Sequence, residues 1–131
     1  MDDSSEWIRI GAAAKRAGMS VKTIRYYSDE GLIAVAARTQ GGYRLYHQHV
    51  VEELRLIQNL RGLGLALGTI RSYLAAKREG ACHCEQLKQS MREQQQAIHQ
   101  KIEALQNLQQ ELHETMQGWV NCGGRLDAKL V

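Results

Sequence analysis

Three cysteines and one histidine carry the most specific chemistry in this sequence. Cys82, His83 and Cys84 are consecutive, and Cys122 follows 38 residues after Cys84. Thiolates bind soft ions such as zinc, cadmium, mercury, lead and copper(I), and an imidazole shifts the preference towards borderline divalent ions. The same thiols could instead sense oxidants or electrophiles, because a thiol at a helix N-terminus ionises readily. An odd number of cysteines predicts free thiols or metal ligands rather than a disulfide framework.

The segment that separates these cysteines is expected to be one long helix. Every seventh position from 84 to 119 is Cys, Met, Ile, Leu, Leu and Trp, and the chain contains no proline. A helix over about residues 84–119 would be roughly 50 Å long, so Cys84 and Cys122 of one chain cannot share an ion. The sequence contains no second long helix to cover the apolar stripe. We therefore expect a second copy of the chain to cover it, the alternative being a helix folded back on its own domain.

The N-terminal part of the chain has the pattern of a helix-turn-helix. Residues 10–17 and 21–30 have helical composition, and the turn Gly18-Met19-Ser20 lies between them, with Ser20 as the expected N-cap. Residues 7–46 contain seven Lys or Arg and two Asp or Glu. This excess favours a polyanionic partner, although many basic segments are simply solvated surface.

The following residues predict a β-hairpin wing and two more helices. Residues 34–36 and 43–46 resemble short strands joined by a glycine turn, and residues 48–61 and 67–78 return to helical spacing. A chain of 131 residues is too short for a barrel enzyme. It has no signal peptide and no apolar run of about 20 residues, so we expect a cytoplasmic protein with no membrane partner.

These motifs together resemble the MerR family of bacterial transcription regulators, and its metal-sensing branch in particular. The resemblance rests on IRIGAAA at 8–14, GMSVKTIRYY at 18–27, EGLI at 30–33 and RTQGGYRLY at 38–46, and it extends over about residues 8–120. It implies a mainly α fold with three parts. These are a winged helix-turn-helix DNA-binding domain (7–79), a long antiparallel coiled-coil dimerisation helix (80–119), and a C-terminal effector loop and tail (120–131).

The resemblance also implies a set of DNA contacts on the second helix, the wing and the third helix. Arg25 is expected to bind a guanine edge or a phosphate, and Tyr27 has equal claims as a DNA contact and as a core residue. For Tyr46 we expect packing on the third helix. The expected DNA-binding residues are Ser20, Lys22, Thr23, Arg25, Tyr26, Tyr27, Arg38, Tyr43, Arg44 and Arg61.

By the same resemblance, the protein would act as a homodimer on an inverted-repeat promoter and would switch RNA polymerase activity by distorting the DNA. Antiparallel pairing would bring Cys82 or Cys84 of one copy to Cys122 of the other, and a tetrahedral site would need His83, His113 or the second N-terminal thiol. Burial of Cys84 as a small core residue is the structural alternative.

The residues are compatible with two other functions. The first is a redox or electrophile sensor of the same family, and the second is a small thiol enzyme using Cys84 and His83. The sequence has no Ser/His/Asp set, phosphate loop or carboxylate pair in a plausible frame, so we expect no enzyme.

Overall fold

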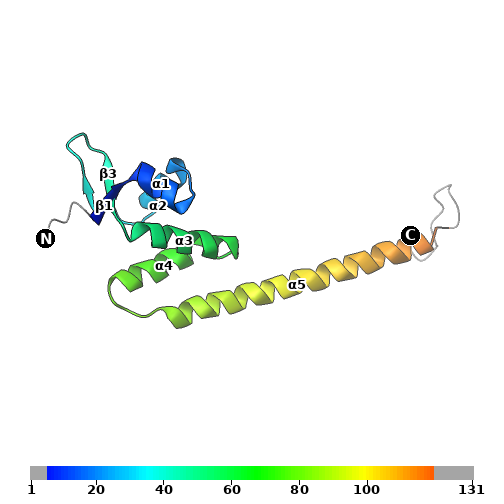
Figure 1. Cartoon of the computed structure of the whole chain (residues 1–131). Coiled ribbons are helices and arrows are strands. Elements are labelled where there is room, and N and C mark those ends of the chain that lie inside the picture. Colours follow the sequence, from blue (N-terminus) through cyan, green and yellow to red (C-terminus); the bar gives the residue numbers. More distant parts are fainter. Residues whose placement is uncertain (1–5, 120–131) are drawn as a thin grey trace. The chain divides into compact units, whose positions relative to one another are not determined.

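The computed structural model describes residues 6–119 and separates the chain into two units, one through Met91 and one from Arg92 onward. It is mainly helical, as predicted, with a small sheet in the first unit (Figure 1). The elements in chain order are β1 (Trp7–Arg9), α1 (Ile10–Ala17), α2 (Val21–Asp29), β2 (Ala37–Arg38), β3 (Arg44–His47), α3 (Val50–Gly62), α4 (Leu67–Arg78) and α5 (Cys84–Gln117).

Helices α1 and α2 form the predicted helix-turn-helix. Gly18 ends α1 in the left-handed conformation, and Ser20 begins α2 by accepting a hydrogen bond from the Thr23 backbone N–H at 3.1 Å. Ala13 and Ile24 are completely buried where the two helices meet the core. A short, alanine-rich first helix therefore allows close approach, and the cap fixes where the second helix starts.

Gly31 follows the end of helix α2, and a glycine is favoured here because the backbone adopts a left-handed conformation. Gly31 has a φ of +80°, and its N–H bonds to the Ser28 carbonyl at 3.1 Å. The Leu32 N–H bonds to the Tyr27 carbonyl at 2.9 Å, and the Leu32 side chain is fully buried. This is a Schellman motif, in which an apolar residue after the glycine anchors the helix end to the core.

The wing belongs to a three-stranded antiparallel sheet with the order β1-β3-β2. The expectation of a strand at residues 34–36 was wrong by position, because β2 lies at Ala37–Arg38, directly beside the turn. The turn sets this register: the Thr39 N–H bonds to the Tyr43 carbonyl at 2.9 Å, and the Tyr43 N–H bonds to the Thr39 Oγ1 at 3.1 Å. Strand β1 was not predicted, and it pairs Ile8 with Tyr46.

Helices α3 and α4 pack against each other and complete the core of the first unit (Figure 1). Tyr46 is fully buried in this core, which confirms its expected packing role. Side chains at helical spacing on α3 and α4 supply much of the remaining apolar surface; the buried ones are Val50, Val51, Leu54, Ile57, Leu60, Ile70, Leu74 and Ala76.

The apolar stripe of α5 is used in two ways. Leu87 and Met91 pack against the core of the first unit, so for these two residues the folded-back alternative is right. From Ile98 onward the large apolar side chains of the second unit are exposed in the single chain; they are Ile98, Ile102, Leu105, Leu108, Leu112, Met116 and Trp119.

We expect Ser20→Ala to lower the free energy of unfolding by about 0.5–2 kcal/mol, because it removes the acceptor for the Thr23 N–H. Urea denaturation followed by circular dichroism measures this change. Ser20→Asp keeps an acceptor at the same position and should retain most of the wild-type stability. Equal stability of Ser20→Ala and the wild type would contradict a capping role.

Candidate nucleic-acid interface and thiol pair

Helix α2 presents three of the expected DNA-binding side chains to solvent. Lys22, Arg25 and Tyr26 are exposed, whereas Ile24 on the opposite side is buried. The Ser20 hydroxyl already forms hydrogen bonds with Thr23, whose own hydroxyl lies 2.8 Å from the Ser20 Oγ. The helix therefore has a solvent-exposed basic face, and the buried side chain of Ile24 on the opposite face fixes its orientation.

Side chains of α2 and α3 together line a shallow hollow of about 330 Å³. Arg61 comes from the last turn of α3 and donates from Nη1 to the Leu65 carbonyl at 3.0 Å, which holds the guanidinium near α2. Tyr27 is half-buried and packs against the core, with its ring centroid 5.9 Å from that of Tyr26. The lining residues are Lys22, Thr23, Tyr26, Tyr27, Arg61 and Leu67, so the structure brings five of the expected DNA contacts into one place.

A second hollow of about 560 Å³ joins α2 to the wing. Arg25, Tyr43 and Arg44 line it, and Tyr43 is 68% exposed. Arg9 lines the same hollow and was missed as a site residue. Its place depends on the pairing of Arg9 with Leu45 in the sheet, and only the alternation Trp7-Ile8-Arg9 hinted at a strand there.

Two arginines of the wing lie opposite each other but have different surroundings. Arg38 is exposed and donates from Nη1 to the Gly42 carbonyl at 2.9 Å, within the turn. The Nη2 of Arg44 lies 2.8 Å from the Oδ1 of Asp29, the last residue of α2. The Tyr46 hydroxyl and Asp29 raise the pKa of Arg44. Arg44 thus attaches the wing to α2, and a DNA contact by this residue stays a prediction.

Cys82 and Cys84 are both exposed in the single chain, so Cys84 is not a core residue here. The backbone N–H and the thiol of Cys84 stabilise a thiolate at Cys82 by hydrogen bonding and lower the pKa of Cys82. The same interaction raises the pKa of Cys84. The pair therefore holds its first negative charge on Cys82.

His83 has a different environment from the two thiols on either side of it. It is half-buried and lines a hollow of about 260 Å³ with side chains of α4, among them Ser72 and Tyr73. Within residues 6–119, no three His, Cys, Asp or Glu side chains are grouped so that they could hold a metal ion. The thiol pair would need a further ligand, and Cys122 lies outside the described residues, as does the expected effector loop and tail (120–131).

Within the described part of the chain, no helix is both long enough and apolar enough to span a membrane.

A helix-turn-helix with an adjacent wing, and with basic and tyrosine side chains gathered along both, defines a winged helix-turn-helix DNA-binding protein. The sequence matches the family described as MerR HTH family regulatory protein over residues 8–77, and the family described as MerR, DNA binding over residues 51–115. The chain belongs to the MerR family of transcription regulators, and it is a DNA-binding regulator rather than an enzyme.

The proteins similar to the chain are transcription regulators, and some of their names mention a metal. The chain is 35% identical over 105 residues to the HTH-type transcriptional regulator ZntR of Escherichia coli (strain K12), covering 79% of this chain and 74% of the relative. It is 34% identical over 104 residues to the mercuric resistance operon regulatory protein of Bacillus cereus, covering 79% of each. The lead(II)-bound transcription regulator PbrR691 from Ralstonia metallidurans CH34 has a similar structure, with a TM-score of 0.73, 27% identity, and coverage of 88% of this chain and 89% of that chain.

We expect iodoacetamide at pH 8 to alkylate Cys82 faster than Cys84, because the lower pKa of Cys82 gives it the larger thiolate fraction. Peptide mass spectrometry over a short time course measures the two rates. Cys84→Ala removes the thiol donor and should slow the reaction of Cys82. Faster alkylation of Cys84 than of Cys82 in the wild type would contradict the assignment.

Proposed function

We propose that this regulator binds an inverted-repeat promoter as a homodimer and changes transcription by RNA polymerase when a thiophilic metal ion binds between its subunits. The observation that carries the proposal is the exposed Cys82–Cys84 pair at the start of α5, on the same unit as the recognition helix α2. Relatives named for heavy-metal dependence and for mercuric resistance support it. The family mechanism of DNA distortion would connect the ion to transcription.

The DNA-binding surface we propose consists of the two hollows and the exposed face of α2. Recognition-helix side chains read base edges while surrounding basic and polar groups bind phosphates. Arg25 is the proposed base contact, since it is exposed on α2 and lines the hollow beside the wing. The remaining proposed contacts bind the backbone: Ser20, Lys22, Thr23, Tyr26, Tyr27, Arg38, Tyr43, Arg44 and Arg61, with Arg9 added by the structure.

Dimerisation through α5 is proposed from its uncovered apolar residues. Ile98, Leu105 and Leu112 are spaced seven residues apart and are between 45% and 65% exposed in the single chain. A stripe of this length at heptad spacing is typical of a helix that packs against another helix. If the two helices are antiparallel, the end of one lies beside the start of the other, which would bring Cys122 to the partner's thiol pair.

The proposed metal ligands are Cys82, Cys84 and Cys122, with His83 or His113 as further nitrogen donors. Thiolates favour zinc, cadmium, mercury, lead or copper(I), and the donor set does not choose among them. The lowered pKa of Cys82 supports metal binding, because a metal must displace the proton of each thiol.

The lowered pKa of Cys82 also favours a second candidate function, a redox or electrophile sensor of the same family. In that case peroxide or an aldehyde would alter promoter activity in the absence of metal. The two candidates share the DNA-binding surface and differ only in what reacts with the thiols.

For DNA binding, we expect Lys22→Ala to weaken binding to all sequences and to reduce the salt slope of the affinity by about 1, as for a phosphate contact. Arg25→Ala should cost about 1–3 kcal/mol on the chain's own promoter and little on unrelated DNA. Fluorescence anisotropy at several salt concentrations measures both. Lys77→Ala, which removes one exposed charge from the last turn of α4, is the matched control. Equal losses for Arg25→Ala on both DNAs would assign Arg25 to the backbone.

For metal binding, we expect the reduced dimer to bind two equivalent ions, and Cys122→Ser to lower the affinity at least about tenfold, since a direct ligand matters more than an outer-shell partner. Titration with zinc, lead and mercury, together with in vitro transcription, measures binding and response. Gln106→Ser, an exposed change on α5, is the control. Unchanged stoichiometry and induction in Cys122→Ser would exclude the intersubunit site, and a response to peroxide alone would favour the redox sensor.

A further inference from the structure

Two arginines of α4 bind the backbone that ends the recognition helix. The Nε of Arg71 donates to the Glu30 carbonyl at 2.6 Å, and the Nη2 of Arg78 donates to the Leu32 carbonyl. Both carbonyls belong to the turn that follows α2, at the negative end of its dipole. The position of this helix end is therefore coupled to the position of α4.

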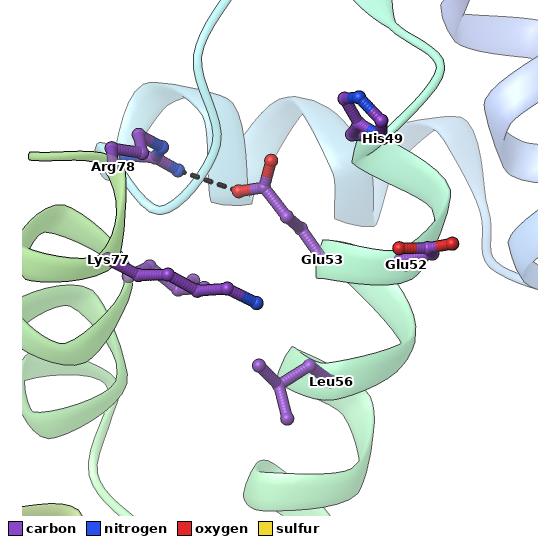
Figure 2. Close-up of a pocket in the computed structure, with 7 residues that line it drawn as sticks. His49, Glu52, Glu53, Leu56, Lys77 and Arg78 are labelled. Carbon is purple, nitrogen blue, oxygen red and sulfur yellow. Dashed lines mark hydrogen bonds and ion pairs between the residues drawn. The ribbon is translucent and has the colours of Figure 1, made fainter. Parts of the chain in front are cut away.

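Arg78 also connects this turn to α3. Its Nη2 lies 3.0 Å from the Oε2 of Glu53, and Figure 2 shows the pair facing each other across the hollow of about 450 Å³ between α3 and α4. Lys77, the neighbouring cation, reaches into the same hollow beside Leu56. Arg78 thus joins α4, α3 and the end of α2 through a single guanidinium.

The thiols are close to Arg78 along a tightly structured backbone. Arg78 is the last residue of α4, and Cys82 follows four residues later. Between them Gly80 has a φ of +78°, and the Ala81 N–H bonds to the Ala76 carbonyl at 2.8 Å. A Schellman turn of this kind is a defined connection rather than a loose linker. A displacement of the thiol segment would therefore act first on the last turn of α4.

We propose that Arg78 is a positioning residue. When a metal ion binds to the segment that carries Cys82 and Cys84, Arg78 transmits the resulting displacement to the recognition helix. The inference rests on the proposed metal response. Movement of the last turn of α4 changes the contacts of Arg78 with the Leu32 carbonyl and Glu53, and so shifts the end of α2 while the Ser20 cap keeps its start. Arg71, two turns earlier on α4, makes a separate contact with this helix end, from its Nε to the Glu30 carbonyl and from its Nη2 to the Glu30 carboxylate. Coupling then depends on a contact with two discrete arrangements.

The test compares Arg78→Met with Lys77→Met in the full-length protein on its own promoter. Both variants remove one positive charge from the last turn of α4, but only the first removes the contacts with Leu32 and Glu53. We expect Arg78→Met to bind metal with wild-type stoichiometry, and to bind DNA without metal within about twofold of Lys77→Met. Metal-dependent induction should fall by about 2- to 30-fold in Arg78→Met and should be unchanged in Lys77→Met.

Two further measurements separate coupling from a general loss of structure. Hydrogen exchange at the amides of residues 31–33 should change on metal addition in the wild type and should not change in Arg78→Met. Arg78→Lys should restore part of the induction, because it keeps a positive charge and N–H donors for Leu32 and Glu53 but lacks the planar guanidinium that holds both contacts in one geometry. If Arg78→Met does not fold, Glu53→Gln, which removes only the ion pair, should still reduce induction.

The outcomes distinguish this inference from the proposed function. Suppose that the wild type responds to metal and that Arg78→Met is induced as strongly as Lys77→Met. The coupling role is then overturned, and the metal response stands. The same conclusion follows if Glu53→Gln, used in place of Arg78→Met, is induced as strongly as Lys77→Met. If the wild type binds no metal and shows no metal-dependent transcription, both are overturned. A loss of induction confined to the Arg78 and Glu53 variants supports the coupling role.

Discussion

The DNA-binding unit depends on how arginines hold the C-terminal end of α2. That end is negative because the helix dipole directs its carbonyls there, and the side chains of Asp29 and Glu30 add negative charge. Arg44 comes to it from the wing, and Arg71 and Arg78 come from α4. The ion pairs of Arg44 with Asp29 and of Arg71 with Glu30 are partly exposed, and each contributes little to stability by itself. Together they connect the wing and α4 to one helix, so the basic surface keeps a defined shape.

Much of this fold could be predicted from local sequence signals. Gly18, Ser20 and Gly31 mark where helices begin and end, and the structure places α1 and α2 at those positions. Strand β1 could not be predicted, because three residues are too few to show an alternating pattern. Its partner β3 is also far along the chain, so no local pattern records their pairing.

The residues of the candidate site could largely be predicted from the sequence, whereas many of their contacts could not. Four expected residues of α2 and Arg61 do meet in one hollow, because helix faces and family motifs follow from the sequence. The contact of Arg44 with Asp29 and the two contacts of Arg78 were not foreseen, since each depends on long-range packing. A heptad series likewise cannot tell an apolar residue that packs on its own core, such as Met91, from one that awaits another helix, such as Leu105.

The border between the two units falls inside α5, seven residues after Cys84, because Leu87 and Met91 pack on the DNA-binding core. The first thiols of the proposed sensor are therefore inherited with the recognition helix, whereas the apolar residues proposed for subunit pairing lie beyond the border. Recombination at this point of the gene would exchange pairing specificity and the C-terminal ligands while leaving operator choice and the Cys82–Cys84 pair together. Operator and effector preferences would then diverge at different rates among descendants of one ancestral regulator.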